Sequence, residues 1–490
     1  MHRIVPLAPL LLAGACTAVG PNFVQPAAPG PEATYASDGG GKAVIAQGPQ
    51  REWWKAFGSD ELDKLVARAL ERNHSLAASR ETLLAARERI KAMIGRTLPQ
   101  VDAHGDASYQ QVNLSAIGLG DRFDIPGFNF DIGNPEFDLY TLGSGVTYDL
   151  DLFGRNRRGV ERAAAQAQAL AHETEAAHLV IAGRVVAQVL AIAALNDRIA
   201  TMQTLLSEDQ RNVTLTEARH RGGVGTMVEV LSAQGELARD RADLPNLEQQ
   251  LAEGRAMLAV LLGVSPGELG PTPYSLEQFA LPSQVPVAMP SSLVRQRPDI
   301  MEAEARLHGA TAAVGIATAE LYPNITLGAS ITQSTSNADK IFSNRFNAFD
   351  LFAGVTAPIF HGGTLKANKR AAEAEARAAA ASYRQVVLDA FGQVSGLLSA
   401  FETDGEALAA RQYSADIAGR SLHLSRRSFQ VGNSGILQVL DASRSYQQAR
   451  LALLDTRARQ FHNIARMYVA TAGGWIGGAG EPDTAALEAP

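Results

Sequence analysis

The spacing of apolar residues divides the chain into long stretches of helical period and short stretches of alternating period. The longest helical stretch runs from Arg155 to Arg221 without a proline and is rich in alanine, glutamate, glutamine, arginine and leucine. These residues lose little side-chain freedom in a helix. The apolar residues recur at intervals of three and four, as they do on the buried face of a helix. At about 1.5 Å of rise per residue, the predicted helix is roughly 100 Å long.

This stretch ends at a glycine-rich segment, 222–225, after which a second predicted helix returns over 228–262. Glycines permit the positive φ angle of a tight reversal. A comparable unit follows, in which a proline-free stretch from Leu365 to Val431 also ends at glycines and is followed by a returning helix. Segments 228–244 and 437–453 match at an offset of 209 residues (437 − 228). Such an internal duplication predicts that functional parts come in pairs.

Four segments of about ten residues switch to the alternation of apolar and polar positions that is typical of half-buried strands. They are 101–112, 140–151, 324–333 and 348–359. A tilted strand of about this length spans a bilayer, and the segments 113–138 and 333–347 are predicted loops. Four strands cannot close a barrel. Three chains would contribute about twelve strands, a number within the range of membrane barrels.

The first fifteen residues have the pattern of an export signal, with a basic start, an apolar run and the small residues 13–15. The single cysteine, Cys16, follows directly, so no disulfide can form within the chain. One interpretation is an ordinary signal peptide. The interpretation we favour is a bacterial lipoprotein signal, in which Cys16 carries acyl chains that anchor the protein stably to a membrane. Ala13 stands where such signals usually have leucine.

Composition excludes several classes of function. The net charge is −7 and no block of lysine and arginine occurs, which argues against a nucleic-acid partner. Metalloprotease, phosphate-loop, dinucleotide and nucleophile-elbow motifs are all missing from the sequence. We therefore expect neither an enzyme nor a metal or cofactor site. After the leader no uninterrupted run of 18 apolar residues occurs, so we also expect no transmembrane helix.

Several stretches carry a resemblance to a known family. They are CTAVGPNF at 16–23, YDLDLFGRNRR at 148–158, RQRPDI at 295–300, PIFHGG at 358–363 and GGW at 473–475. With these stretches the chain resembles the outer membrane factors of tripartite efflux systems, in the TolC-like superfamily and its NodT/OprM-like lipoprotein branch.

The resemblance implies a mixed, mainly α fold in which about four strands per chain contribute to a trimeric transmembrane β-barrel continuous with a long periplasmic α-helical barrel. It implies a homotrimer whose partners are a periplasmic adaptor protein and an RND-type pump of the inner membrane. It also implies a lipid-anchored protein of the Gram-negative outer membrane.

On this interpretation the chain has five parts. They are a signal peptide (1–15), a lipidated extended segment (16–50), a first repeat (51–270) with a helical hairpin at about 155–262, a second repeat (271–475) with a hairpin at about 365–470, and a flexible tail (476–490).

Three sets of residues are candidates for function. The first is the lipid attachment residue, Cys16. The second set, at the two hairpin tips, is expected to contact the adaptor, and its members are Gly222, Gly225, Thr226, Met227, Gly432, Ser434, Gly435 and Ile436. The alternative is that these tips are plain turns. The third set is a possible periplasmic gate of Asp416, Arg420, Arg426 and Arg427, for which the alternative is a solvated helix face.

The predicted function is a passive trimeric exit duct for small molecules such as drugs, solvents or metal ions. An alternative keeps the fold and makes the chain the exit duct of a type I protein secretion system. A third possibility is a periplasmic coiled coil with no pore, against which the bilayer-length strands argue.

Overall fold

The computed structural model describes residues 18–28, 35, 43–46, 51–113, 124–125, 128–129, 135–282, 284–343 and 347–471. Cys16, the predicted tail 476–490 and most of the predicted loop 113–138 lie outside the described residues. The chain forms two compact units. The first comprises residues 1–24, 85–167 and 306–380, and the second comprises residues 25–84, 168–305 and 381–490.

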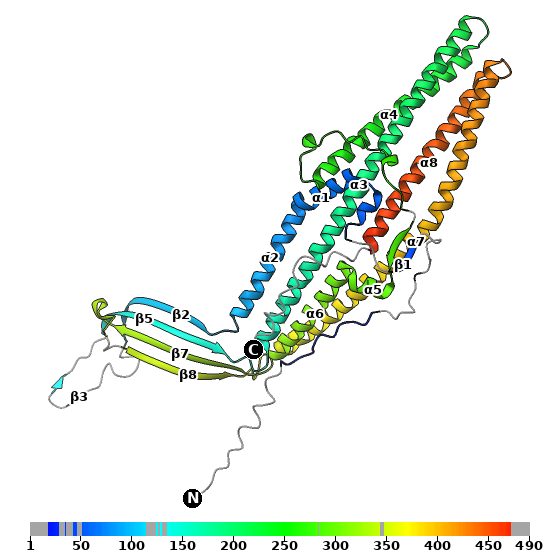
Figure 1. Ribbon diagram of the computed structural model, residues 1–490. Helices are drawn as coiled ribbons and strands as arrows, with labels where there is room; N and C mark the ends of the chain where they lie inside the picture. Colours follow the sequence, from blue (N-terminus) through cyan, green and yellow to red (C-terminus); the bar gives the residue numbers. More distant parts are fainter. Residues whose placement is uncertain are drawn as a thin grey trace. The chain divides into compact units, whose positions relative to one another are not determined.

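The first unit contains a four-stranded antiparallel sheet (Figure 1). Its strands are β2 (Gln100–Gln111), β5 (Glu136–Asp149), β7 (Asn324–Thr335) and β8 (Asn347–Thr356), in the order β2-β5-β7-β8. The two central strands come from distant parts of the chain, and their register places Tyr140 opposite Thr335 and Asp149 opposite Thr326. β5 begins four residues before its predicted start because pairing with β2 extends to Glu136, opposite Gln111. Short strands β3 (Asp124–Ile125) and β4 (Phe128–Asn129) form a separate antiparallel pair.

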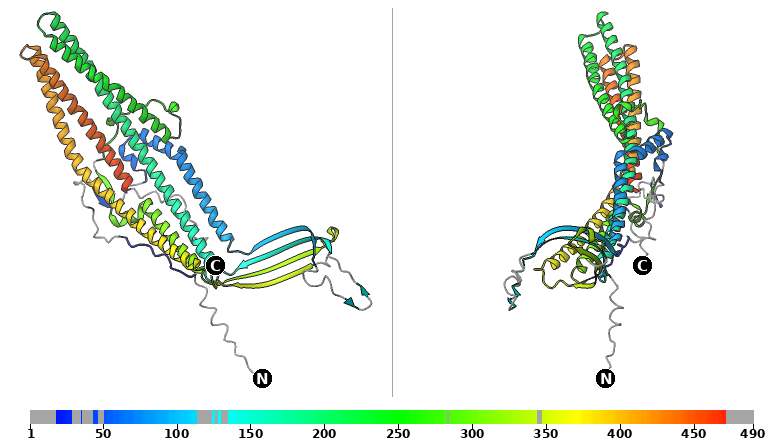
Figure 2. Two further views of the ribbon diagram at one scale, coloured as in Figure 1. Left: turned by 180° about the vertical axis from the view of Figure 1, so that it is seen from behind. Right: turned by 90° about the vertical axis from the view of Figure 1, so that its left-hand side faces the viewer.

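Four long helices form two hairpins. α3 (Arg155–Arg221) is followed by α4 (Met227–Leu261), and α7 (Thr364–Gln430) is followed by α8 (Ile436–Thr471). α3 and α7 each contain 67 residues. α3 begins at Arg155 because the Asp151 carboxylate accepts hydrogen bonds from the backbone N–H groups of Asn156 and Arg157, both at 2.9 Å. These N–H groups have no partner inside the helix. Within the second unit the two hairpins lie side by side in both views of Figure 2.

The chain also contains shorter elements. They are η1 (Trp53–Phe57), α1 (Asp60–Arg72), α2 (His74–Gly95), η3 (Pro266–Glu268), η4 (Leu276–Gln278), α5 (Pro290–Gln296), α6 (Pro298–Ala319), η5 (Ala338–Lys340) and the parallel pair β1 (Ala43–Ala46) and β6 (Val285–Ala288). Asn73 separates α1 from α2: its side-chain oxygen accepts from the N–H groups of Ser75 and Leu76, and its amide donates to the Leu261 carbonyl at 3.0 Å.

The core of the second unit joins η1 to α3, α7 and α8. Trp53 stacks on Tyr468 with ring centroids 5.3 Å apart, and Phe57 lies 6.2 Å from Phe461. Among the described residues one helix, α3, is apolar enough over an 18-residue window to cross a membrane by length and composition alone, and 56% of that window is buried. Our sequence criterion, an uninterrupted apolar run, missed this window. Buried residues of α3 such as Val185, Val189 and Ile192 belong to the core of the second unit.

Candidate functional site

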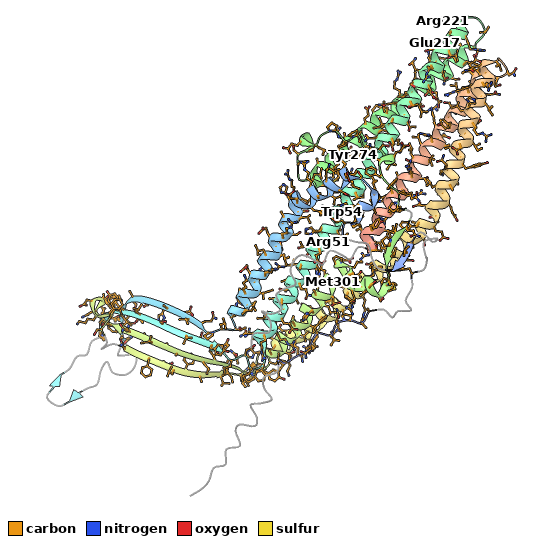
Figure 3. All side chains as sticks on the ribbon, in the orientation of Figure 1. Arg51, Trp54, Glu217, Arg221, Tyr274 and Met301 are labelled. Carbon is orange, nitrogen blue, oxygen red and sulfur yellow. The ribbon has the colours of Figure 1, made fainter. Side chains whose placement is uncertain are left out.

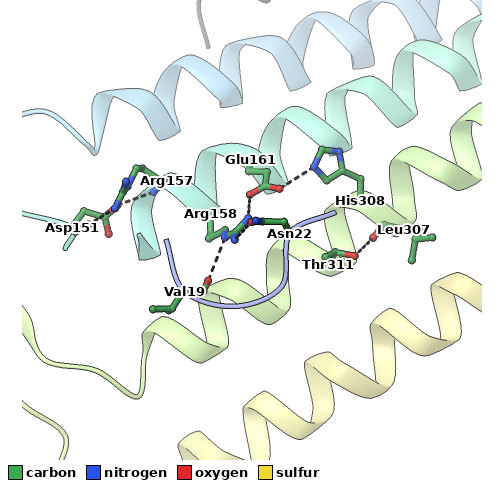
Figure 4. A network of polar contacts seen from close by, with 9 residues as sticks. All are labelled: Val19, Asn22, Asp151, Arg157, Arg158, Glu161, Leu307, His308 and Thr311. Carbon is green, nitrogen blue, oxygen red and sulfur yellow. Dashed lines mark hydrogen bonds and ion pairs between the residues drawn. The ribbon is translucent and has the colours of Figure 1, made fainter. Parts of the chain in front are cut away.

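The described chain begins two residues after Cys16, and its first residues are held by a polar network in the first unit (Figure 4). Arg158, in the first turn of α3, donates to the Val19 carbonyl at 3.4 Å, to the Asn22 side chain at 2.6 Å and to Glu161 at 2.7 Å. A guanidinium presents several N–H donors in a fixed fork. The single buried Arg158 can therefore bind both the backbone carbonyl of Val19 and the side chain of Asn22. Segment 18–24 is thereby fixed against α3 without forming a helix or a strand.

Glu161 extends this network to α6. Its second oxygen accepts from Nε2 of His308 at 2.9 Å, and the His308 ring stacks on Phe23 at a centroid distance of 4.4 Å. The hydrogen bond from His308 lowers the pKa of Glu161 below its ordinary value, against the effect of burial, and Arg158 lowers it further. The carboxylate is therefore held ionised between two donors that also contact the N-terminal segment.

Two glycines let this segment lie against α6. Gly20 has a φ of 92°, and a Cβ built on it would lie 2.6 Å from the Cα of Gly315. A Cβ on Gly315 would instead lie 2.9 Å from side-chain atoms of Arg158. From the sequence, Gly20 belonged to a stretch that carried the family resemblance, whereas Gly315 was not singled out. Arg158, Glu161 and His308 were not predicted as a cluster, because their residues are distant in the sequence.

The Arg297-Pro298-Asp299 stretch begins α6 in the second unit. Arg297 forms an ion pair with Asp299 at 2.8 Å, and it donates to the Ala470 carbonyl at 2.9 Å and to Gln393 at 3.0 Å. Asp299 in turn accepts from the N–H of Ile300. This stretch therefore starts a helix and at the same time joins it to α7 and α8.

The first hairpin tip is a tightly hydrogen-bonded turn at the end of α3, next to Glu217 and Arg221 in Figure 3. Gly222 donates to the Ala218 carbonyl at 3.0 Å, and Gly225 to the Arg219 carbonyl at 3.2 Å. Thr226 caps α4 in a reciprocal arrangement: its hydroxyl accepts from the N–H of Glu229, whose carboxylate accepts from the N–H of Thr226. Met227 and its neighbour Val228 are exposed.

The glycines at the two tips follow the expected turn geometry only in part, since Gly432 has the expected positive φ and the other predicted glycines do not. Positive φ angles occur at Gly223 (77°) and Gly432 (82°), and not at Gly222, Gly225 or Gly435. One αL residue suffices to end each helix. At Gly225 the restriction is one of space and not of backbone angle. A Cβ there would lie 3.1 Å from atoms of Arg219, His220 and Glu229.

Ile436 also differs from expectation. It is 0% exposed and packs in an apolar cluster between the hairpins, so a partner protein cannot contact it here. The exposed apolar side chains at the second tip are Val431 and Leu437. Ser434 lies at this tip and is half-buried.

The four predicted gate residues do not form one cluster. Asp416 accepts a hydrogen bond from Gln412 on its own helix at 3.1 Å, and Arg420 and Arg427 are exposed. Arg426 instead forms an ion pair of 2.5 Å with Glu208 on α3. This carboxylate could not be recognised as a partner from the sequence, because it lies 218 residues away along the chain.

A second ion pair also joins the two hairpins. Glu236 on α4 binds Arg444 on α8 at 3.1 Å and Arg239 on its own helix at 2.8 Å. Within the second hairpin, Asp404 accepts from Arg459 at 2.8 Å and from Asn463 at 2.6 Å. These contacts join the first hairpin to the second and α7 to α8. Among the described residues no group of three or more metal-ligating side chains occurs.

Comparison with known proteins agrees with this geometry. Residues 65–264 and 289–473 match the family described as outer membrane efflux protein. The chain is 30% identical to the pyoverdine export outer membrane protein OpmQ of Pseudomonas putida over 87% of this chain and 89% of that protein. It is 27% identical to the cation efflux system protein CusC of Escherichia coli O6:H1 over 96% and 99%. The structure is similar to that of the outer-membrane channel OprN, with a TM-score of 0.84, 27% identity and coverage of 93% and 99%.

Proposed function

The chain belongs to the outer membrane efflux protein family, and from this membership we propose that it is the passive exit duct of a tripartite efflux system. In this proposal three copies assemble into the duct. An inner-membrane pump of the RND type supplies the energy, and a periplasmic adaptor joins the pump to the hairpin tips. Cys16 anchors each copy to the outer membrane through its acyl chains.

The observation that carries the proposal is the sheet of the first unit. β2 and β8 are its edge strands, and each leaves one side unpaired among the described residues. An unpaired edge is a template for pairing with another chain. β8 also exposes large apolar side chains on one face, including Phe349 (80%) and Leu351 (74%). An apolar face suits a sheet that contacts lipid on one side. Two unpaired edges suit a sheet that pairs with the sheets of further copies to close a barrel.

The internal duplication accounts for the paired elements of the proposed duct. We take 51–270 and 271–475 as two repeats, each contributing two strands and one helical hairpin. The equal lengths of α3 and α7 support this division. Docking of the adaptor at both tips is supported by the exposed apolar residues there, Val224, Met227, Val228, Val431 and Leu437.

The names of the relatives bear on the cargo. OpmQ is named for pyoverdine export and CusC for cation efflux, so we propose a small molecule or ion as the cargo here too. Neither name refers to a secreted protein, which makes the type I secretion alternative the weaker of the two.

Mass measurement and planar-bilayer recording on the purified full chain test the proposal together. We expect a particle of three copies and steady single-channel conductance. Leu351→Asp should reduce membrane insertion, because it places a charge on the apolar face of β8, whereas Asp350→Asn on the opposite face should leave insertion unchanged. A monomer that gives no conductance would support the coiled-coil alternative instead.

A further inference from the structure

Two aspartates are buried inside the first hairpin. Asp209 on α3 is 1% exposed and Asp240 on α4 is 8% exposed. Both carboxyl oxygens of Asp209 and Oδ2 of Asp240 have no hydrogen-bond partner within the part of the chain that the structure describes. An unpaired carboxylate is so costly to bury that it takes up a proton instead. These two residues therefore call for an explanation beyond helix packing.

The two residues occupy one layer of the hairpin. Along α3, Asp209 lies between Leu205 and Val213, and along α4, Asp240 lies between Leu237 and Leu244. These apolar neighbours belong to two separate hydrophobic clusters. A spacing of three or four residues puts each aspartate on the same helix face as the apolar residues around it. The aspartates thus form a polar layer between two apolar ones.

The charged groups around this layer are already engaged with one another. Glu208 is paired with Arg426 of α7, and Glu236 is paired with Arg444 of α8 and Arg239 of α4. The Arg444 charge also interacts with Asp240 and Asp441. Among the described residues no basic side chain forms an ion pair with Asp209. The pKa of Asp209 is raised to about 7, chiefly by burial and next by the neighbouring Asp240 carboxyl, with smaller effects of Glu236 and Glu208.

The second hairpin supplies an internal comparison. At the offset of 209 residues, Asp209 corresponds to Ala418 and Asp240 to Ala449. A hairpin of this length can therefore pack at the same layer with two alanines. The carboxyl pair is a property of the first hairpin alone and is not required for helix pairing.

We propose that Asp209 and Asp240 share one proton, and that this proton is a pH-dependent lock on the first hairpin. With the proton bound, a hydrogen bond between the two carboxyl groups holds α3 against α4. When the proton is lost to water, two like charges remain in a buried layer, and their repulsion loosens the hairpin there. The ion pairs to Arg426 and Arg444 flank this layer, so loosening also weakens the attachment of the first hairpin to the second.

The direction of the pH effect follows from the raised pKa of Asp209. The unfolded residue ionises near its ordinary value of 3.8, whereas the folded residue keeps its proton up to about 7. Stability supplied by the pair is therefore fully present below about pH 4 and is lost as the pH rises through about 7. The hairpin should be tighter in mild acid than in mild alkali.

The test measures the separation of α3 and α4 in the full-length protein purified in detergent. Spin labels are placed at the exposed positions Thr214 and Ala238 in a Cys16→Ser background, and distances are recorded from pH 5.5 to pH 8.5. We expect the distance distribution to broaden and lengthen with rising pH in the otherwise native chain. Asp209→Asn should give a compact, pH-independent distribution, because the amide donates to the Asp240 carboxylate as the protonated acid does. Asp243→Asn, which alters an exposed carboxylate of the same helix, should keep the native pH response.

A second measurement guards against a variant that merely misfolds. Infrared difference spectra of the native chain should show the carbonyl band of a protonated carboxyl group that titrates near pH 7, and this band should be missing in Asp209→Asn. The converse variant, Ala418→Asp with Ala449→Asp, should make the second hairpin pH-dependent. A native distance distribution that does not change with pH, or a native spectrum with no protonated carboxyl group at pH 6, would overturn the proposal. Neither result would bear on whether the protein is a duct.

Discussion

Arg426 on α7 and Glu208 on α3 form an ion pair of 2.5 Å that joins the second helical hairpin to the first. The two residues are distant in the sequence and their side chains are only partly exposed. On α7 the pair lies just before the tip, where α7 ends at Gln430. Together with the pair formed by Glu236 and Arg444, it connects both helices of one hairpin to the other.

Breaking this pair should loosen the end of α7. We expect Arg426→Gln to raise amide hydrogen exchange over residues 424–430 by up to about fivefold, because a partly exposed ion pair contributes about 1 kcal/mol or less. Arg427→Gln, a change at the neighbouring exposed arginine, should leave exchange near its native rate. Equal effects of the two substitutions would show that the ion pair does not hold the helix end.

The N-terminal segment should depend on Arg158. Arg158→Met keeps much of the side-chain bulk but removes the bonds to Val19, Asn22 and Glu161, so segment 18–24 should be cleaved faster by added protease. Arg155→Met removes a more exposed arginine of the same helix turn, whose ion pair with Glu320 is longer, at 3.6 Å, and serves as the control. Cleavage at the native rate in Arg158→Met would contradict this role.

The same segment should respond to acid. The pKa of Glu161 lies below its ordinary value of 4.5 in the folded chain, so its stabilising effect is present above about pH 4.5 and is lost as the pH falls through the lower, folded value. An acid-tolerant protease should therefore release segment 18–24 at lower pH values, and Glu161→Gln should remove most of this dependence. A cleavage rate that is constant down to pH 3 would argue against the ionised carboxylate.

Cys16 can be tested independently of the fold. Cys16→Ser should abolish labelling by radioactive fatty acid while leaving the number of copies in the purified particle unchanged, because the described packing of strands and helices does not involve the lipid. A mature native protein with unmodified Cys16 would show that the signal is of the ordinary kind.

The tips should tolerate side chains at some glycines and not at others. A Cβ at the positive φ of Gly223 or Gly432 costs roughly 1–2 kcal/mol, enough to shift the turn but not to unfold the helices. We expect Gly223→Val with Gly432→Val to insert and assemble normally yet to lose crosslinking to the adaptor and export. Gly435→Ala is the matched control, since no atom lies within 4 Å of its added Cβ. Full export by the double valine variant would contradict the proposal that the tips dock the adaptor.

The turn between β7 and β8 should face the cell exterior if the proposed topology holds. Ala338–Lys340 lies at this end of the sheet and is exposed. An epitope inserted after Asp339 should be labelled by antibody on intact cells, with a periplasmic protein as the control for membrane integrity. Labelling that requires rupture of the outer membrane would reverse the topology.

Local features of the sequence determine the helices. The predicted stretch of Arg155 to Arg221 coincides with α3, and α7 begins and ends one residue before the predicted bounds. Strong helix formers without proline, followed by glycine, specify both length and end. The strands follow from alternation in the same way, although pairing partners move their ends by several residues, as at Glu136 in β5.

Tertiary structure decides what each of these local features contacts. Alternation and periodicity cannot show that β5 pairs with β7, that Ile436 is buried while Leu437 is exposed, or that Asp209 and Asp240 share one layer. Nor can they select Gly223 over Gly222 as the residue with positive φ, because both are glycines in the same turn. The reason is physical. Conformational preference belongs to a residue and its near neighbours, whereas burial, ion pairing and a raised pKa depend on which distant segments approach it.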